Sequence, residues 1–353
     1  MGTLTHALSG ALLARATAPK DASPRSLPRR LAAGFFACAA PDLDIVFALA
    51  GPIPYLELHR GPTHSLVLLP FWALIYSWVL AKILREERGW RALYGITAMG
   101  LALHVAGDVI TSFGTQILWP LSTWRATIGT TYIIDLGFTG IIVAGLIGSL
   151  FVKKSRLPSV GTLALLCAYV GVQFTLKQQA LRFGEEYAAA HGLRGASVHA
   201  DARPVSPFNW TVFVSDESTH RFAHINLARK EPVEYRPGDG FIRRLDAAYL
   251  PQDQAIWVSR ARYGVADQNL VREAWDSPAL GFFRSFALLP ALDGATADPT
   301  CFWFADLRFN TPGRPTVPFQ FGACRAGPGE PWRAYERPEA GETPTSRPAS
   351  SRG

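Results

Sequence analysis

The strongest chemical signal in the sequence is a histidine and an aspartate one helical turn apart, His104 and Asp108. An i, i+4 spacing sets both side chains on one face of a helix. There an imidazole nitrogen and a carboxylate oxygen can bind the same metal ion. The same spacing also suits a buried His–Asp hydrogen bond that ties helices together. The pair is therefore a candidate set of metal ligands that needs further partners elsewhere in the chain.

Two more carboxylates follow a proline, in the sequence Pro41-Asp42-Leu43-Asp44. Proline disfavours a regular helix around it. The two aspartates face the same way only if the backbone there is extended or unwound. One aspartate can then bind a metal ion while the other caps a helix, and a pure capping role is the alternative.

The densest polar stretch is His-Arg-Gly-Pro-Thr-His-Ser at residues 59–65. Gly-Pro makes a turn, and Thr63 is a natural N-cap for the helix that follows. His59 and His64, on either side of the turn, can approach one centre from different directions. Arg60 offers a planar fork that suits a phosphate or carboxylate group. The alternative places His59 and Arg60 among the lipid headgroups.

Two further ionisable residues gain importance from their positions. His6 lies near the start of the first helix-like segment. Asp135 begins a later apolar run. Asp135 either orients a histidine or is simply the polar start of a helix. A carboxylate at mid-bilayer costs on the order of 2.5–3.5 kcal/mol by insertion scales. Several aspartates and histidines in apolar helices must therefore satisfy one another, and a shared cation is the simplest partner for them.

The available ligands are nitrogen and oxygen atoms, because Cys38 and Cys167 lie in apolar helices and are expected to be inert packing residues. Histidine and aspartate without thiolate suit zinc, manganese or iron. Zinc is the leading choice, with one or two ions. A bound divalent metal lowers the pKa of a water molecule toward about 7, and Asp42 or Asp135 would act as general base. Arg60 would hold an anionic group.

These residues lie in a half of the chain with the composition of a membrane protein. The 353 residues are 48% hydrophobic and 18% charged, with a mean hydropathy of +0.11, whereas soluble domains carry roughly 25% charge. Apolar stretches about as long as a bilayer-spanning helix cover residues 31–50, 65–84, 92–113, 131–152 and 157–176. We therefore predict a polytopic α-helical membrane domain over residues 1–176, with about five spans plus a short N-terminal helix at residues 3–16.

The basic residues predict the orientation of this domain. Connections on one side of the spans hold twelve Lys and Arg, and those on the other side hold Arg60 and Arg125. Basic loops stay in the cytoplasm, so we expect a multi-pass protein of the bacterial inner (plasma) membrane with a periplasmic second half. The net charge is +7, and the excess basic residues lie between apolar runs and do not form a basic stripe. We therefore expect no nucleic-acid partner.

Residues 177–326 predict a soluble α+β, β-rich domain. A helix at 181–191 continues from the last span, and residues 268–289 can form a helix over one face. Strand-like runs separated by turn residues, typical of a mostly antiparallel sheet, occur at 210–214, 220–227, 255–263, 301–309 and 317–324. Cys301 and Cys324 lie on neighbouring predicted strands and can form a disulfide in an oxidising compartment, or remain two buried thiols. Residues 327–353 are expected to be a disordered tail.

The motifs of the first half occur in a distinctive order. They are Thr5-His6 with Gly10, the motifs at 41–44 and 59–65, and His104-Val-Ala-Gly-Asp108 running into residues 111–115 and Trp119-Pro120. In this order they resemble the YdjM-type inner-membrane proteins, over about residues 1–150. That family is described as membrane-bound metal-dependent hydrolases, and it is distantly similar to the all-helical zinc-dependent phospholipase C and P1-nuclease group. The similarity implies a ranked set of metal ligands: first His6, Asp44, His64, His104 and Asp108, and then Asp42 and His59.

The residues and the resemblance together predict a membrane-bound metal-dependent hydrolase. We expect it to cleave an ester or phosphoester of a lipidic or amphipathic substrate through a metal-activated water, with a soluble phosphoester as second choice. Its partners would be the lipid bilayer and a lipidic or small phosphorylated substrate. The alternative is a non-catalytic, metal-stabilised membrane scaffold or regulatory protein, and a transporter is third. The sequence leaves the oligomeric state open.

Overall fold

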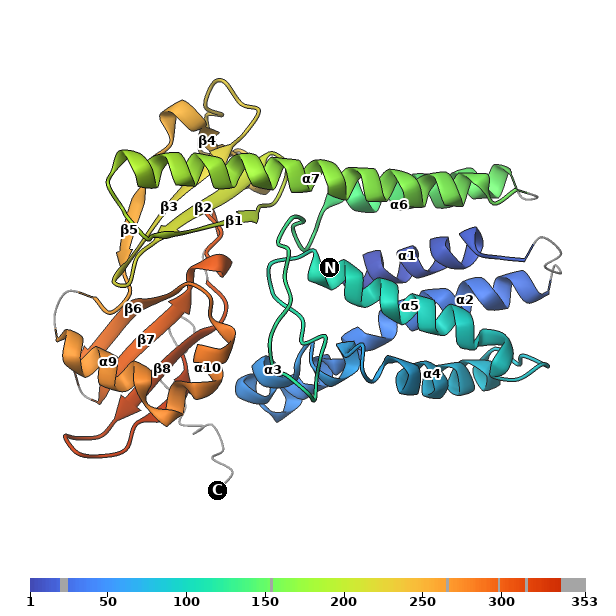
Figure 1. The fold of residues 1–353 in the computed structure, drawn as a ribbon, viewed down its shortest axis with the longest axis horizontal. Coiled ribbons are helices and arrows are strands. Elements are labelled where there is room, and N and C mark those ends of the chain that lie inside the picture. The colour runs from blue at the N-terminus through green and yellow to red at the C-terminus, as the bar shows by residue number, and fades with distance from the viewer. Residues whose placement is uncertain (20–24, 153–154, 265–266, 298, 315–316, 338–353) are drawn as a thin grey trace. The chain divides into compact units, whose positions relative to one another are not determined.

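The computed structural model describes residues 1–19, 25–152, 155–264, 267–297, 299–314 and 317–337. The chain divides into two compact units, and Figure 1 shows the elements of each. One unit consists of Met1–Phe47 and Leu58–Leu176, and the other of Ala48–Glu57 and Lys177–Gly353. The short segment Ala48–Glu57 thus belongs with the second half of the chain, which the sequence did not predict.

The first half of the chain folds into helices. They are α1 (Thr3–Ala16), α2 (Ser26–Ala39), the 3-10 helix η1 (Ala40–Ala50), α3 (Pro52–Leu58), the 3-10 turn η2 (Pro62–His64), α4 (Leu69–Ile83), α5 (Arg91–Val109), α6 (Leu136–Phe151) and α7 (Leu157–Ala190). The end of η1, most of α3 and the last part of α7 fall in the second unit. The segment predicted at residues 31–50 changes from α-helix to 3-10 helix at Ala40, directly before Pro41. The helix expected at residues 181–191 is the continuation of α7.

The described residues contain three helices that are long and apolar enough to cross a bilayer. These are Ser26–Ala50, Arg91–Val109 and Leu157–Ala190, and a fourth span results if the pair Pro52–His64 and Leu69–Ile83, bent by 82°, is counted as one. The predicted number of five is not confirmed. Helix α6 has only 16 residues, about 24 Å at 1.5 Å per residue, which is short for a hydrocarbon core about 30 Å thick.

Helices α1, α2 and α5 approach closely because glycines lie at their contacts. A Cβ atom added to Gly10 would lie 2.1 Å from the carbonyl oxygen of Gly34, and one added to Gly100 would lie 3.5 Å from the same oxygen. Small residues are what allow helices to pack tightly in a membrane. Since His6 and His104 are each four residues from one of these glycines, this packing brings their helix faces together.

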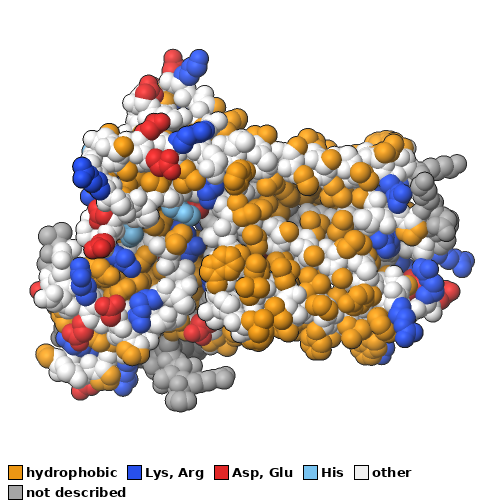
Figure 2. All heavy atoms as spheres, viewed as in Figure 1, with side chains coloured by type: hydrophobic (Ala, Val, Ile, Leu, Met, Phe, Trp, Pro, Cys, Tyr) orange, Lys and Arg blue, Asp and Glu red, His pale blue; other side chains and the backbone are white. Residues whose placement is uncertain are grey.

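Large apolar side chains remain exposed on the helices. Figure 2 shows hydrophobic atoms across the helical region, and the exposed residues include Phe71, Trp78, Ile147 and Leu150. Soluble monomers rarely expose contiguous apolar surface on this scale. The surface is therefore that of helices which contact lipid.

The second unit contains two sheets in the described residues. The first consists of β1 (Ser197–Ala202), β2 (Asn209–Ser215), β3 (Thr219–Asn226), β4 (Leu250–Pro251) and β5 (Val258–Ala261), in the order β1-β2-β3-β4 with β5 also paired to β3. The second is the antiparallel meander of β6 (Pro290–Ala297), β7 (Thr300–Asp306), β8 (Gln320–Arg325) and β9 (Arg333–Glu336). Only β3 and β4 pair in parallel. Short helices accompany the sheets: α8 (Phe241–Ala247), η3 (Gln252–Gln254), α9 (Gln268–Asp276), η4 (Pro278–Leu280), α10 (Gly281–Phe286) and η5 (Leu307–Phe309).

The five predicted strand runs overlap β2, β3, β5, β7 and β8, and the sequence missed the other four described strands. The reason is local: β1 carries His199 and Asp201, and β6 contains proline, aspartate and glycine, which strands disfavour. The helix predicted at 268–289 is broken into α9, η4 and α10 at Pro278.

The disulfide is confirmed. Cys301 and Cys324 are direct partners in the register of β7 and β8, and their sulfur atoms are 2.05 Å apart. The expectation of a disordered tail at 327–353 is wrong for its first part, because β9 pairs with β8. Its remainder, residues 338–353, lies outside the described residues.

Candidate metal centre

The candidate residues come from four parts of the first unit. His6 lies on α1, Asp42 and Asp44 lie on η1, and His104 and Asp108 lie on α5; the turn between α3 and η2 contributes His59 and Arg60, and His64 ends η2. The sequence separations are large, yet these side chains form one buried cluster. We call these eight residues the polar cluster.

The innermost atoms of the cluster are two imidazole nitrogens and two carboxylate oxygens. One ligand atom each from Asp42, His64, His104 and Asp108 lies within 4.8 Å of all the others. His64 Nε2 and His104 Nε2 are 2.9 Å apart, and Asp108 Oδ2 lies 3.2 and 3.3 Å from them. Asp42 Oδ1 is 3.5 Å from His104 Nε2. Small movements would place all four atoms around one cation.

The outer nitrogens of the two histidines decide where the ring protons are. His104 Nδ1 lies 2.6 Å from the carbonyl oxygen of Cys38, which can only accept, so Nδ1 donates. His64 Nδ1 lies 2.9 Å from Thr63 Oγ1, whose proton is donated to Asp44 Oδ2 at 3.1 Å, so this Nδ1 donates as well. In these tautomers, assigned from the hydrogen-bond network, both Nε2 atoms carry lone pairs.

The inner four atoms are therefore all acceptors. Asp108 Oδ2 is buried without a hydrogen-bond partner in the described part of the chain, and so is the second oxygen of Asp42. Burying unsatisfied carboxylate oxygens is costly. Nitrogen and oxygen acceptors that converge without a proton between them fit a divalent cation such as zinc.

Asp44 lies beside this inner group and not in it. Its Oδ1 is 2.7 Å from His59 Nδ1, and its Oδ2 accepts from the backbone N–H of Arg60 at 2.9 Å and from Thr63 Oγ1. The group of close ligand atoms contains Asp42 and not Asp44, whereas the resemblance implies Asp44 before Asp42. In a 3-10 helix, with three residues per turn, residues i and i+2 point to different sides, so only Asp42 faces His104.

Arg60 bridges two carboxylates. Its Nη2 is 3.0 Å from Asp108 Oδ1, its Nη1 donates to Thr111 Oγ1 at 2.9 Å, and its own N–H binds Asp44. It is buried and has a positive φ of 58°, a strained conformation for a side chain of this size. Its two terminal nitrogens contact Asp108 and Thr111, and its Nε has no hydrogen-bond partner among the described residues.

His6 reaches the cluster from the opposite side of Asp108. Its Nε2 is 3.0 Å from Asp108 Oδ1, which also contacts the terminal amine of Met1. The rings of His6 and His104 are stacked with centroids 3.8 Å apart. His6, Cys38 and His104 form a second group with mutually close ligand atoms. Sequence reasoning regarded Cys38 as packing only, and nothing in the sequence marks its carbonyl as the partner of His104.

Comparison with known proteins identifies the first half of the chain. Residues 1–180, half of the sequence, match the family described as YdjM inner membrane protein. The chain belongs to this family. This YdjM family protein is also similar to the uncharacterized protein YfhP of Bacillus subtilis (strain 168), with 31% identity over 96 residues. The matched segment covers 27% of this chain and 29% of YfhP, which is under a third of the length of that relative. No solved structure matches the chain.

The remaining predicted site residue of this YdjM family protein, Asp135, lies in a different network. It is the N-cap of α6, where its Oδ1 accepts from Phe138 N at 2.8 Å. It also accepts hydrogen bonds from Tyr169 and Gln173 of α7. Among the described residues, the hydrogen-bond partners of Asp135 include no histidine of the polar cluster. The structure therefore places this aspartate at the polar start of a helix, which was one of its two expected roles.

Two members of the polar cluster reach the protein surface. The side chains of Asp42 and His59 are 14% and 13% exposed, whereas those of Asp44, His64, His104 and Asp108 are 0% exposed. A molecule that enters the cluster therefore meets Asp42 and His59 first. Leu43 and Ile45, on either side of Asp44 in η1, are exposed apolar residues.

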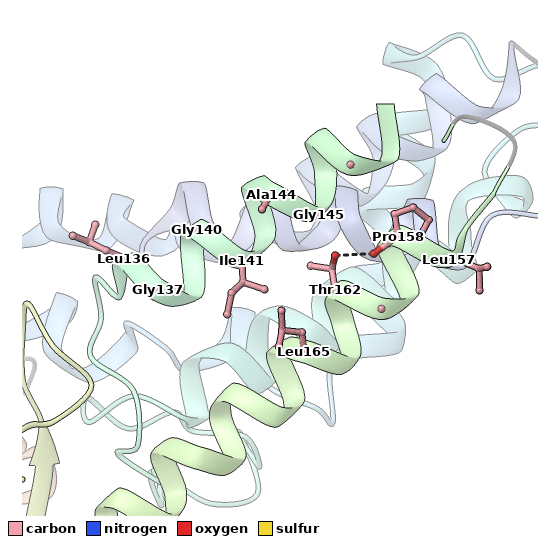
Figure 3. A pocket seen from close by; sticks show the side chains of 12 residues that line it. Leu136, Gly137, Gly140, Ile141, Ala144, Gly145, Leu157, Pro158, Thr162 and Leu165 are labelled. Carbon is pink, nitrogen blue, oxygen red and sulfur yellow. Dashed lines mark hydrogen bonds between the residues drawn. The ribbon is translucent and has the colours of Figure 1, made fainter. Parts of the chain in front are cut away.

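The pocket shown in Figure 3 is separate from the polar cluster. It has a volume of about 660 Å³ and lies between α6 and α7. Its lining is glycine, alanine, leucine, isoleucine and proline with Thr162, whose hydroxyl donates to the carbonyl oxygen of Pro158 at 2.7 Å. With no ionisable side chain, this pocket offers no chemistry of its own.

Proposed function

We propose that this YdjM family protein is a membrane-bound metal-dependent hydrolase. The observation that carries the proposal is the group of four buried acceptor atoms from Asp42, His64, His104 and Asp108, all within 4.8 Å of one another. These residues would hold the metal ion, and zinc is the ion that best suits two imidazoles and two carboxylates. The second group, with His6 and Cys38, shares His104 with the first.

A bound divalent ion supplies Lewis acidity and lowers the pKa of a water molecule. The chain's own residues do the rest. Cys38, through its carbonyl, and Thr63 fix the two histidine rings, and such outer partners commonly raise metal affinity 10- to 100-fold. Arg60 and His6 hold the other oxygen of Asp108, so that Oδ2 stays directed at the inner group.

We infer that the substrate is an ester or phosphoester with an apolar part. Asp42 and His59 are the exposed members of the cluster, and exposed apolar residues of η1 adjoin them. A lipidic or amphipathic molecule in the bilayer can approach along such a surface. The connections on one side of the predicted spans hold twelve basic residues, and basic loops stay in the cytoplasm. We therefore also propose that the second unit, on the other side, is periplasmic.

The test uses the purified full-length protein in detergent. Metal content is measured for the wild type, His64→Ala, Asp108→Ala and the control His191→Ala, which changes an exposed histidine at the end of α7. Cleavage of bis(p-nitrophenyl) phosphate and of a fluorescent phospholipid is followed in parallel. We expect metal and activity in the wild type and control, and loss of both in the two site variants. A wild-type protein without bound metal would contradict the proposal.

A structural ion is the second candidate, and the complete burial of His64, His104 and Asp108 favours it. A metal-stabilised scaffold would lose its fold with its metal and cleave neither probe. Thermal unfolding with and without a chelator, read together with the cleavage assays, separates the two functions.

A further inference from the structure

We propose that Asp44 and His59 are a proton-transfer pair beside the metal centre and not metal ligands, with His59 as the catalytic base and acid and Asp44 as its positioning residue. This inference rests on the proposed hydrolase function and assigns roles within it. The sequence suggested Asp42 as a general base and Asp44 and His59 as metal ligands. In this proposal Asp42 is a ligand, and His59 with Asp44 transfers the proton.

The hydrogen bonds of Asp44 support its positioning role. The carboxylate is completely buried, and its two oxygens accept from His59 Nδ1, Arg60 N and Thr63 Oγ1 at 2.7 to 3.1 Å. These partners occupy three of the roughly four acceptor positions of the carboxylate. What Asp44 does offer is a fixed acceptor for one nitrogen of His59.

That contact determines the state of the His59 ring. An ionised carboxylate only accepts hydrogen bonds, so the neutral ring donates from Nδ1 and carries its lone pair on Nε2. A histidine held in this way by a buried aspartate is oriented for proton transfer and stabilised when it becomes positively charged. The side chain is also one of the two in the polar cluster that reach the surface, where substrate and water enter.

The His59 ring lies beside the ring of the ligand His64. Its ring centroid is 6.2 Å from that of His64, and Asp44 Oδ2 is 3.4 Å from His64 Nδ1. A base can act directly or through one water molecule. His59 and the ligand His64 are thus adjacent but have different partners.

The proposed step is balanced in atoms and charge. As the oxygen of the attacking water forms a bond to the phosphorus or acyl carbon, one of its protons passes to His59 Nε2. The bond from that centre to the leaving oxygen breaks, and the leaving oxygen takes the proton from His59 Nε2–H. The products are an alcohol and an acid, and His59 returns to its neutral form.

The decisive variant is His59→Asn. The asparagine amide nitrogen takes the place of Nδ1 and keeps the hydrogen bond to Asp44, whereas Nε2 is removed. Full-length protein is loaded with Co²⁺, and both the stoichiometry and the visible absorption bands, which respond to ligand changes, are recorded for the wild type, His59→Asn and Asp42→Asn. Cleavage of bis(p-nitrophenyl) phosphate is measured on the same samples.

We expect His59→Asn to bind Co²⁺ with wild-type stoichiometry and spectrum while kcat falls by about 10²- to 10⁴-fold. Asp42→Asn should change the spectrum and weaken binding. For Asp44→Asn, we expect kcat to fall with KM unchanged, because an amide N–H facing Nδ1 favours the wrong tautomer.

The failures of the two proposals can be told apart. If the wild type binds Co²⁺ and cleaves the probe but His59→Asn loses metal or shifts the spectrum, His59 is a ligand and the proton-transfer pair is refuted alone. If His59→Asn keeps both metal and full activity, the pair is refuted as well. If the wild type binds no metal or cleaves no ester, the proposed hydrolase function fails and this inference fails with it.

Discussion

At the scale of single residues, the polar cluster is organised by what its side chains can donate. Thr63, the Cys38 carbonyl and Asp44 use up the outer nitrogens of three histidines, so that only acceptors point inward. Arg60 supports two carboxylates at once from a left-handed backbone conformation. Strain of this kind persists only where the surrounding contacts hold it, and it marks the turn at residues 59–65 as the organising segment.

Thr63 provides a residue-scale prediction. Changing Thr63 to Val removes the hydroxyl that contacts both Asp44 and His64, so we expect metal affinity to fall 10- to 100-fold. Thr63→Ser keeps the hydroxyl and should stay within a few-fold of the wild type. Competition with a chelator of known affinity measures both. Equal affinities for Val and Ser would show that the hydroxyl does not orient the ligand.

His224 provides a second residue-scale prediction, in the second unit. Burial, with a smaller contribution from Arg203, lowers the pKa of His224 to about 3, from about 6.5 in an unfolded chain. Below pH 6.5 the unfolded state binds a proton that the folded state excludes, so His224 destabilises the fold progressively as the pH falls toward 3.

The corresponding variant is His224→Gln, compared with the wild type by thermal unfolding in detergent. We expect the Tm of the variant to rise relative to that of the wild type between pH 7.5 and pH 5. A difference in Tm that does not change with pH would contradict this prediction. The lowered pKa of His220 leaves a remaining pH dependence in both proteins.

At the scale of elements, close helix packing decides where the ligands meet. The carbonyl oxygen of Gly34 on α2 lies near Gly10 of α1 and Gly100 of α5, so three helices share one contact. His6, His104 and the Cys38 carbonyl lie on these helices within four residues of it. Any movement of α1 away from α2 therefore moves the metal centre too.

Gly10→Ala tests this coupling. The added Cβ would lie 2.1 Å from the Gly34 carbonyl oxygen and 2.5 Å from Cβ of Cys38. We expect the stability to fall by about 1–3 kcal/mol, the usual cost of overpacking, and the metal affinity to fall with it. Gly95→Ala on α5 is the matched control, since its Cβ would meet nothing within 4 Å. Thermal unfolding and chelator competition give both quantities, and unchanged values for Gly10→Ala would exclude a tight α1–α2 contact.

At the scale of the whole molecule, the two units differ in charge and in their redox requirements. The first 176 residues carry six more basic than acidic side chains, and the rest carry one more. The second unit contains the disulfide, and disulfides persist in oxidising compartments. Both features motivate the proposal, tested below, that the second unit lies outside the cytoplasm.

Removing the disulfide tests its contribution. The bridge joins residues 23 positions apart, and a loop of this size corresponds to about 3 kcal/mol of chain entropy. We expect Cys301→Ala with Cys324→Ala to destabilise the second unit by about that amount. In denatured wild-type protein, a thiol reagent should label Cys38 and Cys167 before reduction and all four cysteines after it. Four labelled cysteines before reduction would exclude the bridge.

Reporter fusions test the orientation. A fluorescent protein that folds only in the cytoplasm should be active after Arg88 and inactive at the C-terminus. Alkaline phosphatase should be inactive after Arg88 and active at the C-terminus. The reason is that the loop at residues 84–91 is basic and basic loops stay in the cytoplasm. A C-terminus in the cytoplasm would overturn the proposed route of substrate entry.

The sequence by itself determined the class of the protein and the residue types of its site. Apolar runs indicated membrane helices, the spacing of His104 and Asp108 indicated one ligand face, and the strand pattern allowed a disulfide between Cys301 and Cys324, with two buried thiols as the alternative. These are local properties, set by composition and by the period of a helix or strand.

Only the tertiary structure decided how the polar residues are distributed. It joined Asp42 to the inner acceptors, gave Asp44 to His59, paired Arg60 with Asp108, and left Asp135 as a helix cap. The direction of each side chain depends on where an α-helix becomes a 3-10 helix and on how closely distant glycines allow helices to pack. Both are set by contacts between segments far apart in the chain, which no local pattern records.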